Sequence, residues 1–204
     1  MGSFCLTWCN GDLNGAEKQL DTSLEIANFS WNQQEEISEN TEKALVLVFS
    51  PTGNTKKIAS FISEITDSDL TEILPMIPYT EEDLNYNVKD SRANNEQNDS
   101  HARPEIATEI SLEGYDKIYL GYPIWWWDLP MIVYTFLDNH DFSWKKVYLF
   151  NTHEWSGNSW TYRSLKNRLS TADVNTDWLT MRWQDARKDS AKSEVEKWLK
   201  GLWF

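Results

Sequence analysis

Residues 44–58 read ALVLVFSPTGNTKKI, and this stretch decides the fold. Apolar and β-branched residues from Ala44 to Phe49 predict a buried strand, and the residues that follow the turn predict a helix. The first N–H groups of a helix lack partners and carry positive partial charge, so this turn favours phosphate. A capped helix without a ligand is the alternative. The candidate phosphate ligands are Ser50, Thr52, Gly53, Asn54 and Thr55.

Other phosphate-binding classes do not fit this turn. The sequence around Gly53 has neither the GxxxxGK[ST] pattern of nucleoside triphosphate loops nor the GxGxxG pattern of dinucleotide turns. A low-molecular-weight phosphatase needs a nucleophilic cysteine and an arginine in the loop, and both are missing. Lys56 and Lys57 follow the turn and add positive charge beside it.

Length and charge restrict the function classes. The chain has 204 residues and a net charge of −13, which fits one domain plus a tail and disfavours nucleic acid or an anionic membrane surface as a partner. A basic redox protein partner or a small-molecule acceptor fits better, and nothing indicates the oligomeric state. The three histidines show no metal-ligand spacing, and the two cysteines, Cys5 and Cys9, give no disulfide framework.

The N-terminal segment, residues 1–43, is polar and acidic and is expected to be an arm or linker before a domain at 44–204. Residues Leu6 to Cys9 compare with the end of a bacterial lipoprotein signal, except that Trp8 replaces a small residue. Two interpretations stay open: an altered signal on a cell-envelope lipoprotein, or a tail on a cytoplasmic protein. Residues 24–29 offer one apolar packing contact, and no apolar stretch is long enough to span a membrane.

Strand and helix patterns alternate along the rest of the chain. This alternation predicts an α/β fold with a parallel, doubly wound sheet and right-handed crossovers. Residues 81–100 are polar and predict an exposed helix followed by a loop through 94–99. The expected strands after the first are 69–74, 117–121, 146–150 and 178–181, and the expected helices are 54–66, one after Pro130, 160–169 and 186–200.

Two unusual loops follow the strands at 117–121 and 146–150. The first reads YPIWWWDLP from Tyr122, and the second reads NTHEWSGNS from Asn151. The carboxyl ends of parallel strands meet at one edge, so both loops should face the phosphate turn. Trp125 and Trp126 offer aromatic faces for a flat ligand, or they cover the sheet edge. Thr152, Glu154, Ser156 and Asn158 can form hydrogen bonds with a polar rim, whereas His153 is a proton donor or a structural residue.

The segments GYPIWWWDLPMIVYTFL and DFSWKKVYLFNTHEWSGNS resemble the branch of the flavodoxin family that reads GYPIWWGDLP and THEGSG. The resemblance covers about residues 44–204. It implies a three-layer sandwich around a five-stranded parallel sheet of order 2-1-3-4-5, with FMN as the cofactor. The first loop would bind the phosphate, the second the flavin ring and the third its pyrimidine edge. It assigns to the second and third loops Pro123, Ile124, Trp125, Trp126, Trp127, Thr152, His153, Glu154, Trp155, Ser156, Gly157 and Asn158.

Tryptophan stands at three positions where the resemblance implies glycine: Trp127, Trp144 and Trp155. A left-handed conformation at such a residue costs about 1–2 kcal/mol, and an indole can fill a ligand pocket. The chain has twelve tryptophans, so we interpret the sequence as altered from a parent with glycine at these sites. Phosphate recognition should survive better than ring recognition.

The sequence therefore predicts an FMN-binding protein of low-potential electron transfer, with no catalytic side chain assigned. It would be a carrier for a protein partner, or a reductase that takes hydride from NAD(P)H and reduces a small acceptor such as a quinone. No nicotinamide-binding motif is visible. The alternative is a binding module of the same fold in which Trp127 and Trp155 block the flavin site.

Overall fold

A computed structural model of the chain describes residues 42–202. The lipoprotein-like segment Leu6 to Cys9, the apolar cluster at 24–29 and nearly all of the expected arm lie outside the described residues. The boundary at 43/44 between arm and domain stays a prediction.

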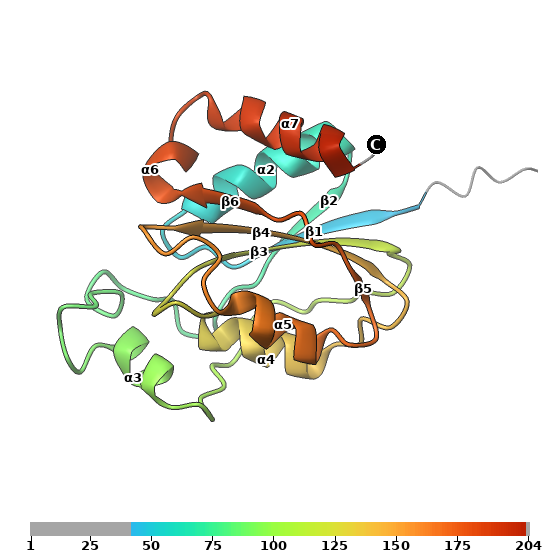
Figure 1. Cartoon of the computed structure of the whole chain (residues 1–204). Helices are drawn as coiled ribbons and strands as arrows, with labels where there is room; N and C mark the ends of the chain where they lie inside the picture. The colour runs from blue at the N-terminus through green and yellow to red at the C-terminus, as the bar shows by residue number, and fades with distance from the viewer. Residues whose placement is uncertain (1–41, 203–204) are drawn as a thin grey trace, which may run out of the picture. The chain divides into compact units, whose positions relative to one another are not determined.

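A parallel sheet forms the middle layer (Figure 1). Its order is β2-β1-β3-β4-β5, and every pairing between neighbours is parallel, which confirms the predicted order 2-1-3-4-5. A sixth strand, β6, also pairs with β4. The strands are β1 (Ala44–Val48), β2 (Asp69–Glu72), β3 (Lys117–Pro123), β4 (Lys146–His153), β5 (Asp173–Val174) and β6 (Leu179–Arg182).

The fifth place in the sheet differs from the sequence prediction. We expected one last strand at 178–181, but two short strands share that place beside β4. β5 pairs with the start of β4 at Lys146 and Val147, and β6 pairs with its end from Phe150 to His153. With two residues, β5 is too short to show a periodic pattern, so it could not be predicted from sequence.

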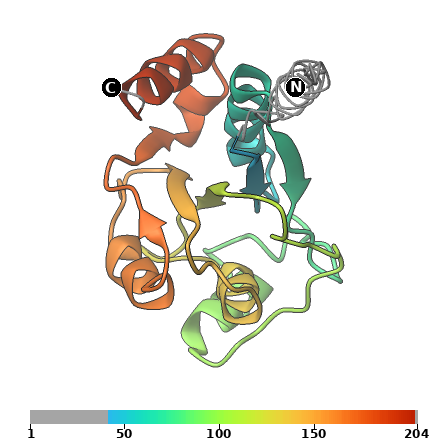
Figure 2. The same ribbon diagram turned by 90° about the vertical axis from the view of Figure 1, so that its right-hand side faces the viewer.

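Helices cover both faces of the sheet (Figure 1). α2 (Asn54–Thr66), α6 (Trp183–Ala186) and α7 (Ala191–Leu202) lie on one face. α4 (Met131–Asn139) and α5 (Thr161–Arg168) lie on the other, and Figure 2 shows the same separation from a second direction. The expected closing helix 186–200 begins later, at Ala191, and α6 is a separate short helix that ends at Ala186. Val195, Trp198 and Leu199, the apolar residues expected in the closing helix, are buried.

Alternate residues of the strands fill two apolar cores. Leu45 and Leu47 of β1 belong to the core under α4, whereas Val46 and Val48 belong to the core under α2 and α7. This alternation is expected for a strand buried on both faces. The ring of Phe150 on β4 occupies the space beside Gly121 of β3, and a Cβ added at Gly121 would overlap it. Glycine is therefore required at this point of the sheet.

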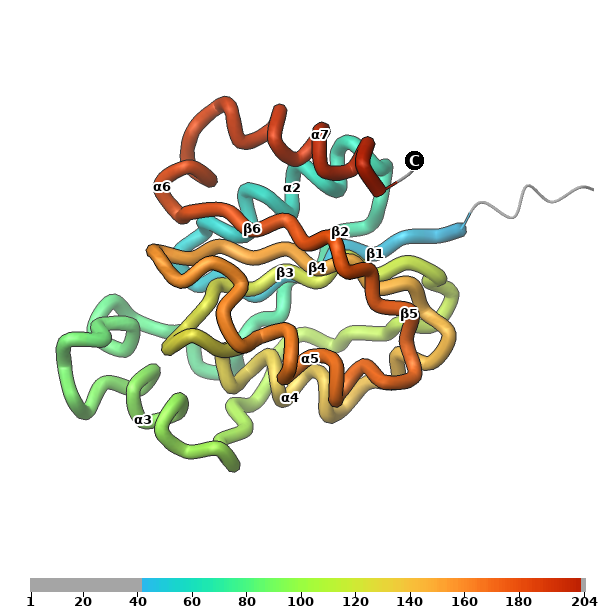
Figure 3. The backbone as a smooth tube through the Cα atoms, viewed as in Figure 1, coloured from blue at the N-terminus to red at the C-terminus, as the bar shows by residue number. Residues whose placement is uncertain are grey.

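β3 and β4 both continue beyond the ends predicted from sequence. β3 reaches Pro123 and β4 reaches His153, and these extensions pair with each other up to Pro123 and Thr152. The segments that follow β1, β3 and β4 lie at the same end of the sheet (Figure 3). The polar segment of α3 (Arg92–Asn98) lies near that end.

Candidate functional site

The turn after β1 has the geometry of an anion site. Gly53 has a φ of 79° and precedes α2, and Ser50 accepts hydrogen bonds from the N–H groups of Gly53 and Lys56 through its carbonyl oxygen and Oγ. Among the described residues, the N–H groups of Asn54 and Thr55 donate to no protein atom. Two helix N-terminal amides thus remain free to bind an anion.

The side chains of this turn are fixed from behind. Oγ1 of Thr55 lies 2.7 Å from Oγ1 of Thr152 on β4, and both residues are buried. Asn54 is also buried and donates to Oγ1 of Thr52 at 3.0 Å. Since Oγ1 of Thr52 acts as an acceptor in this bond, its own proton is available to donate. Thr52 is exposed, so its hydroxyl is the one in this turn that is best placed to bind a ligand.

A third cation, which the sequence did not indicate, lies beside the turn with Lys56 and Lys57. Lys56 forms an ion pair with Glu72 at 2.6 Å, and Nζ of Lys57 donates to the carbonyl oxygen of Arg187 at 2.7 Å. Arg187, which follows α6, donates from Nε to Oδ1 of Asn54 at 2.8 Å. It forms no ion pair with a described residue. Arg187 was missed because it lies 133 residues from Asn54 in sequence.

The loop after β3 turns back on itself in a two-residue hairpin. Trp125 and Asp128 exchange two backbone hydrogen bonds, at 3.0 and 2.8 Å, around Trp126 and Trp127. These central residues have φ values of 47° and 63°, and positive φ at both central positions is the feature of a type I′ turn. Such turns prefer Asn-Gly because a side chain in this conformation costs about 1–2 kcal/mol.

Positive φ also occurs at Trp144, at 67°, but Trp155 is not among the positive-φ residues. Two of the three tryptophans that stand at expected glycine positions therefore have the backbone conformation that favours glycine. Trp127 and Trp155 are not packed into the protein, since their exposed fractions are 60% and 68%.

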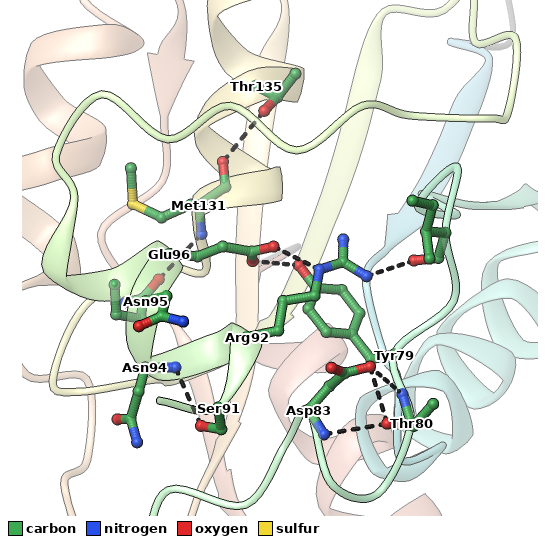
Figure 4. A network of polar contacts seen from close by, with 12 residues as sticks. Tyr79, Thr80, Asp83, Ser91, Arg92, Asn94, Asn95, Glu96, Met131 and Thr135 are labelled. Atoms are coloured by element: carbon green, nitrogen blue, oxygen red, sulfur yellow. Dashed lines mark hydrogen bonds and ion pairs between the residues drawn. The ribbon is translucent and has the colours of Figure 1, made fainter. Parts of the chain in front are cut away.

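Trp125 is held in a box of aromatic rings. It packs edge to face against Phe49 at 5.5 Å, Tyr79 at 5.4 Å and Trp126 at 6.3 Å between ring centroids. The hydroxyl of Tyr79 donates to Glu96 of α3 at 2.5 Å, and the guanidinium of Arg92 lies 4.0 Å from the same ring (Figure 4). Trp125 thus both covers the sheet edge and lines the site.

Helix α3 corrects the sequence interpretation of residues 81–100. The helix begins at Arg92 and ends at Asn98, where a loop was expected, and the earlier part of the segment forms turns. Ser91 caps it by accepting from the N–H of Asn94 (Figure 4). Its buried face includes Asn94, so a search for apolar periodicity could not find it.

One polar side chain of α3 supports the tryptophan hairpin. Nε2 of Gln97 donates to the carbonyl oxygens of Trp125 and Leu129, both at 3.2 Å. Oε1 of Gln97 accepts from the N–H of Met131, the first residue of α4, at 3.1 Å. The amide of Gln97 thus forms three hydrogen bonds, one with Trp125 near the start of the loop and two with Leu129 and Met131 at its end. Gln97 therefore holds both ends of the loop.

The loop after β4 is shaped by His153. Its Nδ1 accepts from the N–H of Gly157, whose φ is 60°, at 3.1 Å. Burial, and then the nearby Arg182, lowers the pKa of His153. The neutral ring that accepts at Nδ1 carries its proton on Nε2. This supports His153 as a structural residue with one hydrogen to donate. Beside it, the guanidinium of Arg182 lies 4.2 Å from the ring of Trp155.

The three loops meet around a cavity of about 470 Å³, within the range of cofactor sites. Ser50, Gly53, Thr55, Gly157 and Asn158 do not line it. Among these, Asn158 accepts from Asn151 at 3.0 Å. Leu84, Tyr86, Ala93 and Trp183 line it although the sequence did not indicate them. The expected residues on its wall are Thr52, Asn54, Pro123, Ile124, Trp125, Trp126, Trp127, Thr152, His153, Glu154, Trp155 and Ser156.

A family model described as Flavodoxin matches residues 43–202. The chain belongs to the flavodoxin family. Its fold and sheet order are those expected of a flavodoxin, as the sequence resemblance implied. Among curated proteins, none matches the chain significantly.

Solved flavodoxin-like structures agree. A candidate flavoprotein from Bacteroides uniformis is 33% identical, with a TM-score of 0.69 over 78% of this chain and 97% of that one. A flavoprotein from Lactobacillus acidophilus, in complex with FMN, is 28% identical, with a TM-score of 0.56 over 78% and 99%. Oxidised Flavodoxin 2 from Bacillus cereus shares the fold at 19% identity, with a TM-score of 0.51 over 78% and 99%.

Two further features of the described residues concern metal ions and membrane spans. Within residues 42–202, no cluster of His, Cys, Asp or Glu has the arrangement needed to hold a metal ion. None of the helices in that range combines the length and the apolar character that a membrane span requires.

Proposed function

We propose that this chain binds FMN and transfers electrons. The observation that carries the proposal is the convergence of three strand-end loops on one cavity. Free amides of Asn54 and Thr55 lie at the turn after β1, and aromatic side chains line the wall formed by the loop after β3. The relative from Lactobacillus acidophilus that is solved with FMN supports the choice of ligand.

The donor set fits the chemistry of FMN. The N–H groups of Asn54 and Thr55 and the hydroxyl of Thr52 would bind the phosphate, with Arg187 as the neighbouring cation. Pro123, Ile124 and the tryptophan hairpin would contact the ring. Nε2–H of His153 is the hydrogen-bond donor best placed by its tautomer for the polar edge of the ring.

Bound FMN would supply the redox chemistry, and the protein would tune its potential. The net charge of −13 disfavours additional negative charge on the ring, which favours a low potential. The same charge makes a basic redox protein a suitable partner, because opposite charges accelerate encounter. Reduction of a quinone with NAD(P)H is the second candidate, and the cavity, open to solvent beside exposed Trp127 and Trp155, favours access by a small acceptor.

The test is the visible absorption spectrum of the purified chain, before and after incubation with excess FMN and removal of free ligand. Retained flavin bands at about one FMN per chain are expected for one pocket of this size. Riboflavin, which lacks the phosphate, is the matched ligand and should be retained less. Consumption of NAD(P)H with a quinone then separates a reductase from a carrier. A folded chain that retains neither flavin contradicts the proposal and supports a binding module whose site is blocked.

A further inference from the structure

Trp127 occupies a backbone position that favours glycine. It is the second central residue of the Trp125–Asp128 hairpin, with a φ of 63°, and its predecessor Trp126 also has positive φ. Gly53 and Gly157, in the other two loops of the same site, have φ values of 79° and 60°. A Cβ at either glycine would meet no atom within 4 Å, so conformation rather than space explains glycine there. Position 127 has the same conformational requirement.

The indole of Trp127 gains little from the protein in return. The residue is 60% exposed, and no described hydrogen bond or ring contact uses its side chain. Its backbone contributes instead, because its carbonyl oxygen accepts from the N–H of Trp160 at 3.1 Å. Trp125, two residues earlier, contacts three aromatic rings. The indole of Trp127 therefore lines the cavity but contributes no contact that stabilises the fold.

Resting on the proposed function, we infer that position 127 is the main determinant of flavin affinity in this chain, and that its tryptophan lowers that affinity. Two causes act together. The indole lines the cavity beside Trp126 and Trp155, where it competes with a flat ligand for space. The strained turn also resists the small backbone adjustments by which a loop closes on a ligand.

Four variants of the full chain test this inference. Trp127→Gly removes both indole and strain, and Trp127→Ala removes the indole alone. Trp155→Gly removes an indole that lines the cavity, at a residue whose backbone φ is not positive. Trp144→Gly is the matched control, since Trp144 has a φ of 67°, is 95% exposed and lies outside the cavity wall. FMN dissociation constants and thermal midpoints would be measured for all.

Trp127→Gly is expected to lower the Kd for FMN by about tenfold, the change that 1.4 kcal/mol produces. Trp127→Ala should give part of that gain, Trp155→Gly a smaller gain and Trp144→Gly none. Tight FMN binding by the unchanged chain, with no gain in Trp127→Gly, overturns the inference while the proposed function stands. If neither the unchanged chain nor Trp127→Gly, both folded, binds FMN, the inference and the proposed function both fail.

A second inference rests on a different observation: the same anomaly occurs at two remote turns. Trp144 has positive φ and an almost fully exposed indole, yet it has no part in the cavity. The chain has twelve tryptophans and eight glycines, whereas about 7% glycine is usual. The glycine codons GGG and GGA differ from UGG and UGA, respectively, in one base. UGA, a stop codon in the standard code, is read as tryptophan or glycine in variant codes.

We propose that positions 127 and 144 are encoded by UGA and are glycine in the protein made by its own cells. The supporting result is UGA at both codons, UGG at Trp125 and Trp198, and native peptide masses that fit glycine at 127 and 144. Trp125 and Trp198 are the controls because both indoles pack against other aromatic rings. UGG at 127 and 144, or native peptides with tryptophan there, overturns the proposal.

Discussion

The two halves of the proposed flavin site differ in how well the local sequence suits the local backbone. In the phosphate half, glycine occupies the positive-φ position, helix amides point outward and buried threonines fix the turn. In the ring half, tryptophan occupies both positive-φ positions of a hairpin. Natural sequences usually agree with the fold at every level, and disagreement marks a functional or altered position. The proposed phosphate half thus has a backbone that suits its sequence, whereas the hairpin of the ring half is held by hydrogen bonds from Gln97 of α3.

The support of the ring half by α3 gives the largest expected effect. Gln97→Glu keeps the shape of the side chain but replaces the donor to two carbonyl oxygens by an acceptor. We expect a loss of about 2 kcal/mol in the free energy of unfolding, and weaker FMN binding, because polar groups lose their partners. Urea unfolding measures it. Asn98→Asp, the same chemical change at an exposed neighbour, is the control, and equal midpoints for the two variants would show that Gln97 supports nothing.

The contact between the halves gives the next effect. Thr55→Val removes the hydroxyl that lies 2.7 Å from that of Thr152 and leaves a buried polar group alone. The expected loss of stability is about 1–2 kcal/mol. A double variant with Thr152→Val should regain part of it, because no orphaned hydroxyl remains. Strictly additive losses in this cycle would mean that the two hydroxyls do not interact.

The proposed phosphate half is tested by removing Arg187, the cation that contacts Asn54. Arg187→Gln should raise the Kd for FMN by about three- to fivefold, a modest change because the guanidinium is exposed. The Kd for riboflavin should not change, since it carries no phosphate. Lys188→Gln makes the same change of charge at the next residue, which is paired with Asp185. If Lys188→Gln weakens FMN binding as much as Arg187→Gln does, the effect is one of general charge.

The smallest effect concerns pH and the ring half. The folded protein lowers the pKa of His153 below its ordinary value of 6.5. The unfolded chain therefore binds the proton more readily, and stability rises with pH in this range. The contribution is complete above about pH 6.5 and is lost as pH falls through the lower folded value. Urea unfolding between pH 7.5 and 5, compared with His153→Gln, measures it. The difference between the two proteins should shrink as the pH falls, and a difference independent of pH would contradict it.

Local patterns predicted the alternation of strands and helices, the turn after β1 and most of the cavity wall, whereas the sheet order followed from the family resemblance. Apolar runs identified the central strands, and the loops at their ends followed from parallel topology. Sequence reasoning failed where the signal is not local. Gln97, Arg187 and Trp183 reach the site from segments without apolar periodicity or with large separation in sequence. Helix α3 was misplaced because polar side chains hold it.

The family resemblance led us to expect backbone strain at Trp127 and Trp144, and the positive φ values of both residues show it. Trp155 shows that such expectations are not uniform, since its backbone is not left-handed and its indole stacks on Arg182. Composition indicated that tryptophan is overrepresented but not which indoles are redundant. Exposure separates them: Trp198 is buried and donates to the carbonyl oxygen of Asp177, whereas Trp144 is free in solvent.

The close approach of Phe150 to Gly121 restricts how this sheet can evolve. A methyl group at 121 would overlap the ring at 150, so position 121 cannot change while position 150 keeps its phenyl ring. An alanine at 121 becomes tolerable only in a chain that has already exchanged the phenyl ring for a smaller side chain. The order of change in this central pair of strands is therefore fixed: homologues can carry a smaller residue at 150 beside glycine at 121, but a side chain at 121 should occur only where position 150 has lost its phenyl ring.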